Sequence, residues 1–418
     1  MAQPATTLLL WWWGEDEAPG LGRWLHTTIE AFQAANPGVR VKAELEEGWE
    51  VVDRFTKAAA ARQPPDLQYF WNGIYHIENA WRGYIAPLEP LIPASELERM
   101  GSTPLSTYQG QTFRVGWYLI PVVWLVNRRI LIQSGVEADA IPPRTWDDLL
   151  AQCEQVKAAG HVPIETGDLE GDFSVWWLTH FLVQQFDRPR DAGQLFLGGL
   201  DWRDPPHYAH WDMLKTVWEA GYINADAPTT DLWEAVRRFS EGQGAFTLAS
   251  GPMFPACERA LGDDVIIAVA PIAGGGALAG LPIIDTQGLG IASGSEHQEE
   301  AAQFLRFLHR TEQRDRLWEE LRLLPANTAW DGGGRIAYPE YRKMWDWFVQ
   351  GPATLYLPDL MPVHFHFEGM APLGKRIMAG ELDGAAAAAH AAEVTRQWRA
   401  RNSDEVEHYR VWIEGLPP

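Results

Sequence analysis

Cysteine, lysine and long hydrophobic runs are scarce in this sequence. Its two cysteines, Cys153 and Cys257, are too few for a disulfide framework or a cysteine-based metal site. They either form one disulfide or remain free thiols, and the sequence leaves both possibilities open. The longest wholly apolar run, 118–126, has nine residues, whereas a membrane-spanning helix needs about 18. We therefore expect a soluble chain.

Positive charge is also scarce. The formal net charge is −22, only six of the 34 basic residues are lysine, and no block of Lys or Arg stands out. A field of this sign repels nucleic acid and acidic membrane surfaces, and it disfavours a strongly anionic ligand. The first seven residues lack the basic segment of a secretion signal. Either the protein is cytoplasmic or a leader preceded this sequence.

Tryptophan is abundant by contrast. The chain has 22 Trp, and aromatic residues make up 12% of it. Some of these rings must fill cores, because large aromatic side chains dominate buried surface. A surplus of this size also suits a site that binds the apolar faces of sugar rings.

Strands and helices alternate along the chain, which predicts an α/β fold. The apolar run 7–13 is typical of a strand covered on both faces. Leu25, Ile29 and Phe32 recur at helical spacing, and the sequence Asn-Pro-Gly at 36–38 ends that helix. Residues 39–45 alternate as a second strand. At 418 residues the chain fits two lobes of about 200 residues each.

Further elements follow from the same patterns. Thr145 with Asp148, and Ser295 with Gln298, resemble capping boxes that open helices. The other helices are expected near 77–81, 174–185, 211–218, 232–239 and 385–389, and the other strands near 67–71, 114–126, 246–249 and 265–269.

Six segments, taken in order, resemble the extracellular solute-binding proteins of carbohydrate ABC importers, the maltose-binding-protein-like group. They are LLLWWWGEDE with IEAFQAANPGVRV, PPDLQYFW, RGYIAPLEPLI, VVWLVNRRILIQSGV with PPRTWDDLL, FSEGQGAFTLASGPM, and GLGIASGSEHQEEAAQFLRFL with LPAN. The resemblance covers about residues 7–330. Val126 and Phe246-Thr247 depart from the family pattern.

The resemblance implies the type II periplasmic-binding-protein fold, in which two Rossmann-like lobes are joined by hinge strands. We expect the N-terminal lobe to hold 1–116 and 267–321, and the C-terminal lobe to hold 117–266 and 322–418. A ligand would bind in the cleft between the lobes and drive hinge closure. The implied function is that of a receptor that delivers a small neutral carbohydrate to a membrane permease.

The candidate ligand-binding residues rest on strand ends and on family position. Ligands of open α/β sheets lie beyond the carboxyl ends of the strands, which favours the loop after the first strand. Trp177 is preferred over Trp176, and Met253 stands where the family has a stacking aromatic, so Phe254 can replace that role. The candidates are Trp13, Glu15, Asp16, Trp71, Asn72, Trp117, Tyr118, Asp172, Trp177, Met253, Phe254, Asp285, Gln287, Phe365 and His366.

Other functions find less support. His364, His366 and Glu368 would share one face of an extended segment, but a metal site needs further ligands. No signature of a catalytic nucleophile, a phosphate-binding loop or a dinucleotide site occurs. We therefore expect no cofactor and no enzyme activity, although a secreted carbohydrate-active enzyme remains a less favoured alternative.

The partners and location follow from the resemblance. We expect a sugar ligand, ABC permease subunits, no nucleic acid, and a monomer located in the periplasm or outside the cell, with a lipid anchor as an option. A polyol, a glycosyl-glycerol or a compatible solute is the alternative ligand on the same scaffold.

Overall fold

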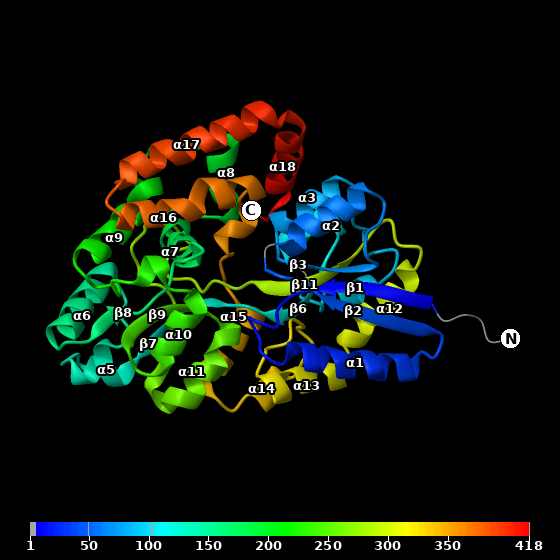
Figure 1. Cartoon of the computed structure of the whole chain (residues 1–418), viewed down its shortest axis with the longest axis horizontal. Helices are drawn as coiled ribbons and strands as arrows, with labels where there is room; N and C mark the ends of the chain where they lie inside the picture. The colour runs from blue at the N-terminus through cyan, green and yellow to red at the C-terminus, as the bar shows by residue number, and fades with distance from the viewer. Residues whose placement is uncertain (1–5, 49, 102, 418) are drawn as a thin grey trace. The chain divides into compact units, whose positions relative to one another are not determined.

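The computed structural model describes residues 6–48, 50–101 and 103–417, and Figure 1 shows their elements. They form two units, each assembled from separate segments. The described residues of Met1–Ile120, Asp285–Trp345 and Glu414–Leu416 form unit 1, and those of Pro121–Ile284, Asp346–Ile413 and Pro417–Pro418 form unit 2. The sequence predicts that the chain passes from one lobe to the other after residues 116, 266 and 321. In the structure the chain passes between the units after residues 120, 284 and 345.

Unit 1 is built on a five-stranded sheet with the order β2-β1-β3-β11-β6. Its strands are β1 (Thr6–Trp12), β2 (Val39–Leu45), β3 (Leu67–Phe70), β6 (Val115–Leu119) and β11 (Thr286–Ile291), beside a small hairpin of β4 (Thr107–Tyr108) and β5 (Gln111–Thr112). β1 is parallel to β2 and β3, whereas β11 is antiparallel to β3 and β6. The predicted strand–helix–strand unit at the start of the chain is confirmed.

Helices cover both faces of this sheet. They are α1 (Leu21–Ala35), α2 (Glu50–Ala60), α3 (Ile74–Trp81), α4 (Ala94–Leu97), α12 (Gln298–Leu308), α13 (Thr311–Leu321) and α14 (Gly332–Arg335). Figure 1 shows α1 and α13 on one side of the strands and α2 and α3 on the other. This two-sided cover explains why β1 is an almost uninterrupted apolar run.

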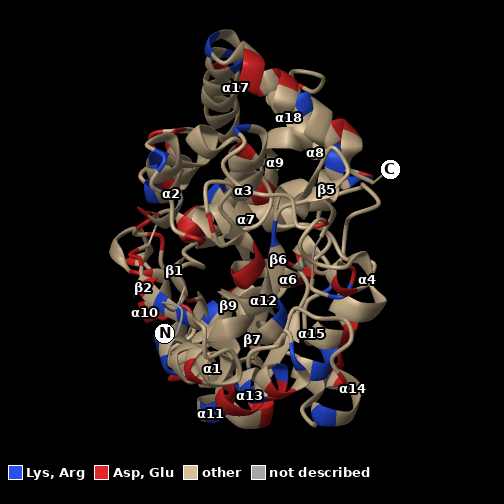
Figure 2. Ribbon diagram, turned by 90° about the vertical axis from the view of Figure 1, so that its right-hand side faces the viewer, with Lys and Arg blue, Asp and Glu red and all other residues tan. Residues whose placement is uncertain are grey.

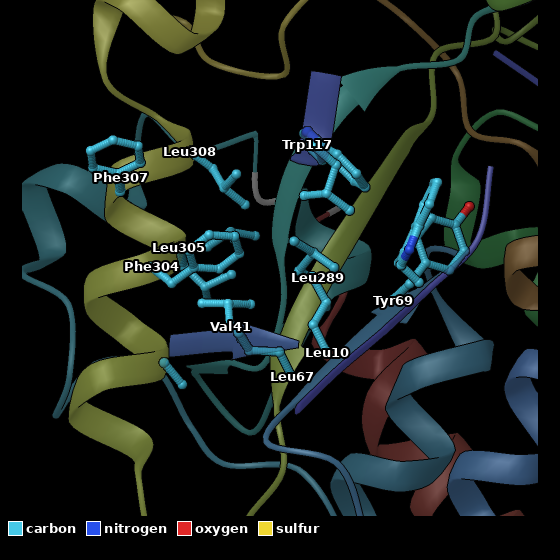
Figure 3. Packing of buried hydrophobic residues seen from close by; sticks show 14 of the residues in the cluster. Leu10, Val41, Leu67, Tyr69, Trp117, Leu289, Phe304, Leu305, Phe307 and Leu308 are labelled. Atoms are coloured by element: carbon cyan, nitrogen blue, oxygen red, sulfur yellow. The ribbon is translucent and has the colours of Figure 1, made fainter. Parts of the chain in front are cut away.

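The core of unit 1 joins α1, α12 and α13 to the sheet. Phe32 of α1 packs edge-on against Phe304 of α12, with ring centroids 5.1 Å apart. Figure 3 shows Phe304 and Leu305 projecting from α12 toward the strands that carry Val41 and Leu289. Each fully buried side chain of this kind contributes about 1.5–3 kcal/mol to folding.

Unit 2 is built on a four-stranded sheet with the order β10-β7-β9-β8. Its strands are β7 (Val122–Asn127), β8 (Val162–Ile164), β9 (Gly244–Ser250) and β10 (Val265–Ala268). The sheet is mixed, since β8 is parallel to β9 while β7 is antiparallel to both β9 and β10.

Many helices surround the second sheet. They are α5 (Arg128–Gln133), α6 (Trp146–Ala158), α7 (Asp172–Leu182), α8 (Pro189–Leu197), α9 (Pro205–Glu219), α10 (Leu232–Ser240), α11 (Phe254–Leu261), α16 (Ala371–Met378), α17 (Gly384–Arg401), α18 (Ser403–Gly415) and the π-helix η8 (Phe365–Met370). The helix α15 (Pro339–Gln350) passes from unit 1 into unit 2, and the last two residues of α18 belong to unit 1.

The predicted helix starts have different outcomes. The capping box at α6 is confirmed, because Thr145 accepts from the backbone N–H of Asp148 and the Asp148 carboxylate accepts from that of Thr145. The prediction that Ser295 opens α12 is wrong. That helix begins at Gln298 after the N-cap residue His297. The Ser295 hydroxyl donates to the carboxylate of Asp66 and accepts from the backbone N–H of His297.

The two cysteines are free thiols. Cys153 lies in α6 and Cys257 in α11, and both side chains are buried. Burial raises the pKa of Cys153 well above its usual range and that of Cys257 to about 12. Both thiols are therefore protonated and unreactive at neutral pH. Within the described ranges, no helix is long and apolar enough to cross a bilayer.

Gly288 of β11 offers a test of the packing between strands. A Cβ at this position would clash with the carbonyl oxygen of Val115 and with the Arg114 guanidinium, whereas a Cβ at Gly38 meets nothing within 4 Å. We expect Gly288→Ala to lower the free energy of unfolding by about 1–3 kcal/mol, measured by chemical denaturation. Gly38→Ala is the matched control and should change it by less than about 0.5 kcal/mol. Equal stability of both variants would contradict the described register of β11 and β6.

Candidate functional site

The carboxyl ends of β1 and β3 and the amino end of β11 lie together at the same end of the strands of the first sheet. β1 and β3 run parallel, and Gly288 of the antiparallel β11 lies opposite Phe70 of β3. The residues that follow β1 and β3 therefore lie beside those that begin β11. Ligands of open α/β sheets bind at this end of the strands.

Glu17 is the buried acid at the centre of this end of the sheet. The Tyr118 hydroxyl donates a hydrogen bond to Glu17 Oε2 at 2.9 Å, and Gln287 Nε2 donates to the same oxygen at 3.1 Å. Burial raises the pKa of Glu17 to about 7, the two hydrogen bonds lower it, and the neighbouring Asp285 raises it. Near neutral pH this carboxyl group is therefore protonated in part of the molecules and charged in the rest.

A glycine lets the loop after β1 approach Tyr118. Gly14 has a φ of +124°, and a Cβ there would lie 2.7 Å from the Tyr118 hydroxyl oxygen. The backbone N–H of Ala18 donates to the Gly14 carbonyl at 2.8 Å, which closes the turn that carries Glu17. Glycine at position 14 thus allows Glu17 to reach β6 and β11.

Glu15 and Asp16, the two predicted acids of this loop, have different surroundings. The Glu15 carboxylate accepts from the backbone N–H of Gly20 at 2.8 Å and of Gly22 at 2.6 Å. It therefore caps the start of α1, where backbone donors lack partners within the helix. Asp16 is exposed. The structure thus gives Glu15 a structural role, and the buried acid of the loop is Glu17, which the sequence analysis did not select.

Trp13 and Trp71 are half-buried members of an aromatic cluster. Their ring centroids are 5.6 Å apart, and each ring also contacts Tyr69. Trp71 further contacts Tyr75 at 5.6 Å. Among the three neighbouring tryptophans of the first strand, Trp13 alone keeps partial exposure, as its position after the end of β1 dictates.

Two buried polar atoms beside this cluster have no protein partner. They are the Tyr69 hydroxyl oxygen and Gln287 Oε1. Burial raises the pKa of Tyr69 well above its usual value, and the nearby Glu17 carboxylate raises it as well. Buried polar groups are nearly always hydrogen-bonded, and those that are not call for an explanation. A bound molecule with hydroxyl groups would give both atoms a hydrogen-bond partner.

Asn72 is a structural residue in this arrangement. Its side chain is buried, donates to Thr103 at 3.0 Å and accepts from Ser106 and Arg114. The fully buried Arg114 guanidinium also donates to the Phe70 carbonyl and to Thr286. These contacts join β3, β6 and β11 and give Asn72 a structural role, while its ligand contact stays a prediction.

The remaining candidates of unit 1 are buried. Trp117 lies in the core, 5.8 Å from the Trp24 ring, and its ligand contact stays a prediction. Tyr118 contributes its hydroxyl to Glu17, as described. Asp285 and Gln287 are both 1% exposed, and the Asp285 carboxylate accepts from the Thr286 backbone N–H at 2.6 Å.

Asp172 and Asp168 form an acidic pair at the start of α7 in unit 2. Asp168 is fully buried and accepts from the Ser174 backbone N–H at 2.9 Å and hydroxyl at 2.6 Å. Asp172 is half-buried, and burial together with the Asp168 and Asp231 carboxylates raises its pKa to about 7. Burial also raises the pKa of Asp168 to about 6.

Trp177 and Phe365 are core residues. The Trp177 indole N–H donates to the His210 carbonyl at 2.8 Å, and its ring lies 4.6 Å from Phe181. Phe365 packs between Phe196 and Trp202. Both rings are buried within unit 2, and their ligand contacts stay predictions. The neighbour that keeps partial exposure is Trp176.

The other candidates of unit 2 are also buried. Met253 and Phe254 lie where β9 turns into α11. His366 lies in η8, and burial lowers its pKa to about 4. The segment is helical rather than extended, and His364 and Glu368 pair across one helical turn at 3.1 Å. No cluster of three or more potential metal ligands occurs in the part of the chain that the structure describes.

Comparison with known proteins decides the family. Residues 18–315 match the family described as bacterial extracellular solute-binding protein. This chain belongs to the bacterial extracellular solute-binding proteins. The predicted membership is confirmed. No curated protein matches the chain.

Solved structures of solute-binding proteins share the fold of this one. A chitin oligosaccharide binding protein has a TM-score of 0.82 and 19% identity, over 95% of this chain and 99% of its own. The GacH receptor of Streptomyces glaucescens, solved free and with acarbose, has a TM-score of 0.76 and 18% identity, over 96% and 100%. A Bacillus licheniformis sugar transporter protein in complex with stachyose has a TM-score of 0.74 and 18% identity, over 94% and 100%. The predicted fold class is confirmed.

The buried carboxyl group of Glu17 makes stability depend on pH. Its pKa is raised from 4.5 to about 7 in the folded state, so the folded protein binds more protons than the unfolded chain between these values. Glu17 therefore favours the folded state more as the pH falls through this range. Glu17→Gln, which carries no charge, should gain stability relative to wild type above pH 7, by on the order of 2 kcal/mol.

This gain should disappear near pH 4.5, the ordinary pKa of a glutamic acid. The measurement is urea unfolding across the pH range, with Asp16→Asn as the exposed control in the same loop. A difference between Glu17→Gln and wild type that stays constant with pH would refute the shifted titration of Glu17.

Proposed function

We propose that this protein is the substrate-binding receptor of an ABC transporter that captures a small neutral carbohydrate. The observation that carries the proposal is the group at the strand ends of unit 1. There, the half-buried rings of Trp13 and Trp71 lie beside unpartnered buried polar atoms of Tyr69 and Gln287. Indole rings suit the apolar faces of sugars, and the polar atoms suit their hydroxyl groups.

The charges of this group favour a neutral ligand. Glu17 and Asp285 are acidic, and the buried Arg114 is engaged by the Phe70 carbonyl and Thr286. A carboxyl group with a pKa of about 7 both accepts and donates hydrogen bonds near neutral pH. Hydroxyl groups offer both complements, whereas an anionic ligand would meet acidic side chains.

Closure of the two units around the ligand is the second part of the proposal. The chain passes between the units at several points, which suits a hinge made of a few segments. The contribution of unit 2 would come from the half-buried Asp172 and Trp176, with Met253, Phe254 and His366 closer to its interior. The closed form of the receptor would then deliver the sugar to the permease subunits.

Location and assembly complete the proposal. The family is extracellular, and we infer that this receptor acts as a monomer in the periplasm or on the outer side of the membrane, where a lipid anchor would hold it near its permease. Sugar oligomers are named for several solved structures of the same fold, among them chitin oligosaccharide and stachyose. This supports a carbohydrate over a polyol or compatible solute.

The ligand class is tested by thermal unfolding against mono-, di- and trisaccharides, polyols and osmolytes. A ligand at 100 times its dissociation constant should stabilise the folded protein by about 2.7 kcal/mol. We expect a shift with a carbohydrate that is recovered unchanged. A shift with only polyols or osmolytes would assign the alternative ligand, and consumption of the compound would refute the receptor function.

The site is tested with the tryptophans of unit 1. Trp13→Ala and Trp71→Ala should each weaken binding of that carbohydrate by at least tenfold, about 1.4 kcal/mol, because each removes an apolar ring face. Trp218→Ala, on α9 of unit 2, removes a ring that is likewise half-buried and serves as the control. Affinities from calorimetry that are unchanged in both test variants would place the site elsewhere.

A further inference from the structure

A pocket of about 550 Å³ lies within unit 1, away from the strand ends. It is formed by the end of α1, by α4, by the end of α12, by the start of α13 and by residues 327–329. Helix α1 begins beside Glu15 and reaches the pocket at Phe32 and Asn36, and its 15 residues span about 20 Å. The pocket therefore lies at the other end of this helix from the proposed sugar site.

The lining of this pocket is basic although the protein is strongly acidic. Arg99, Arg306, Arg310 and Arg314 line it, and Glu96 is the one acid among its lining residues. Both oxygens of Glu96 accept from Arg306, each at 2.7 Å, so this pair is neutralised. Three arginines remain, in a chain whose formal net charge is −22.

These three arginines lack anionic partners. Arg310 lies over the Phe307 ring, 4.7 Å from its centroid. Arg314 donates to two neutral oxygens, those of Asn327 at 2.7 Å and Thr311 at 3.1 Å. Among the described residues, no carboxylate forms an ion pair with Arg99, Arg310 or Arg314.

Arg314 is the most informative of the three. Its side chain is 9% exposed, and its buried Nε–H has no hydrogen-bond acceptor. Burial lowers the pKa of this guanidinium. Charged side chains are almost never buried unless they are paired, because removing a charge from water costs several kcal/mol. An unpaired arginine at the edge of a pocket therefore points to an anion that the pocket holds.

The start of α13 adds to the positive potential. This helix of 11 residues begins at the pocket. Its N-cap residue is Arg310, and the Arg310 side chain makes no capping hydrogen bond. The first backbone N–H groups of a helix carry a partial positive charge and bind anions. His309 adds no positive charge, because burial lowers its pKa to about 3 and its neutral ring accepts from Asn327. Acidic residues occur along α13, as Figure 2 shows, and Glu312 lies in its first turn. Glu312 is exposed and does not line the pocket, whereas Arg314 of the same helix does.

We propose that this pocket binds a small molecule through a phosphate group, held by Arg99, Arg310 and Arg314 at the start of α13. The planar guanidinium fork matches two phosphate oxygens at once, which makes arginine the usual side chain for such a group. The volume of the pocket is that of sites for small organic ligands, so a phosphate ester fits as well as the inorganic ion.

Equilibrium dialysis of the full chain with radiolabelled inorganic phosphate tests the proposal, with glucose 1-phosphate as a second arm. Sodium chloride keeps the ionic strength constant, because exposed charges are screened by salt. We expect saturable binding that Arg310→Gln weakens at least tenfold. Tighter binding of glucose 1-phosphate than of phosphate would identify an ester as the ligand, and the reverse would identify the free ion.

Arg322→Gln is the matched control. Arg322 is an exposed arginine at the opposite end of the same helix, 5.0 Å over the Trp318 ring, and it does not line the pocket. Its loss removes the same charge and the same kind of ring contact, and binding should be unchanged. No saturable binding by the wild type at millimolar phosphate and glucose 1-phosphate, or equal losses in Arg310→Gln and Arg322→Gln, would overturn the proposal.

Discussion

The buried carboxyl group of Glu17 is the contact on which the strand ends of unit 1 depend. It joins the loop after β1 to Tyr118 of β6 and Gln287 of β11, across 101 and 270 residues of sequence. A charged acid in this position is costly, and its raised pKa is the sign of that cost. The same buried group lies with unpartnered polar atoms and two half-buried indole rings at the strand ends, so that this end of the sheet is also the part best suited to a polar ligand.

Much of the fold could be predicted because its signals are local. The apolar run of β1, the helical spacing in α1 and the Asn-Pro-Gly stop at Asn36 depend on neighbouring residues only, and each element occurs where it was expected. The start of α12 was misplaced because Ser295 bonds to Asp66, which is 229 residues away. The segment around His366 is a π-helix that no local pattern indicated, and its Phe365 ring packs against Phe196 in unit 2.

The candidate site was less predictable for the same reason. Strand ends and family position pointed to the loop after β1, but which of its three acids is buried depends on contacts far apart in sequence. Glu15 caps α1, Asp16 is exposed and Glu17 is buried against β6 and β11. A run of three acids directly before Ala18 was the available signal, and it carries no information on which member turns inward.

A crystal structure with the carbohydrate that stabilises the protein most is the most direct test of the account. We predict that a sugar hydroxyl lies within hydrogen-bond distance of the Tyr69 hydroxyl oxygen or Gln287 Oε1, with a ring face against Trp13 or Trp71. A sugar bound elsewhere, with these polar atoms still unpartnered, would contradict the claim that the strand ends of unit 1 form the binding site.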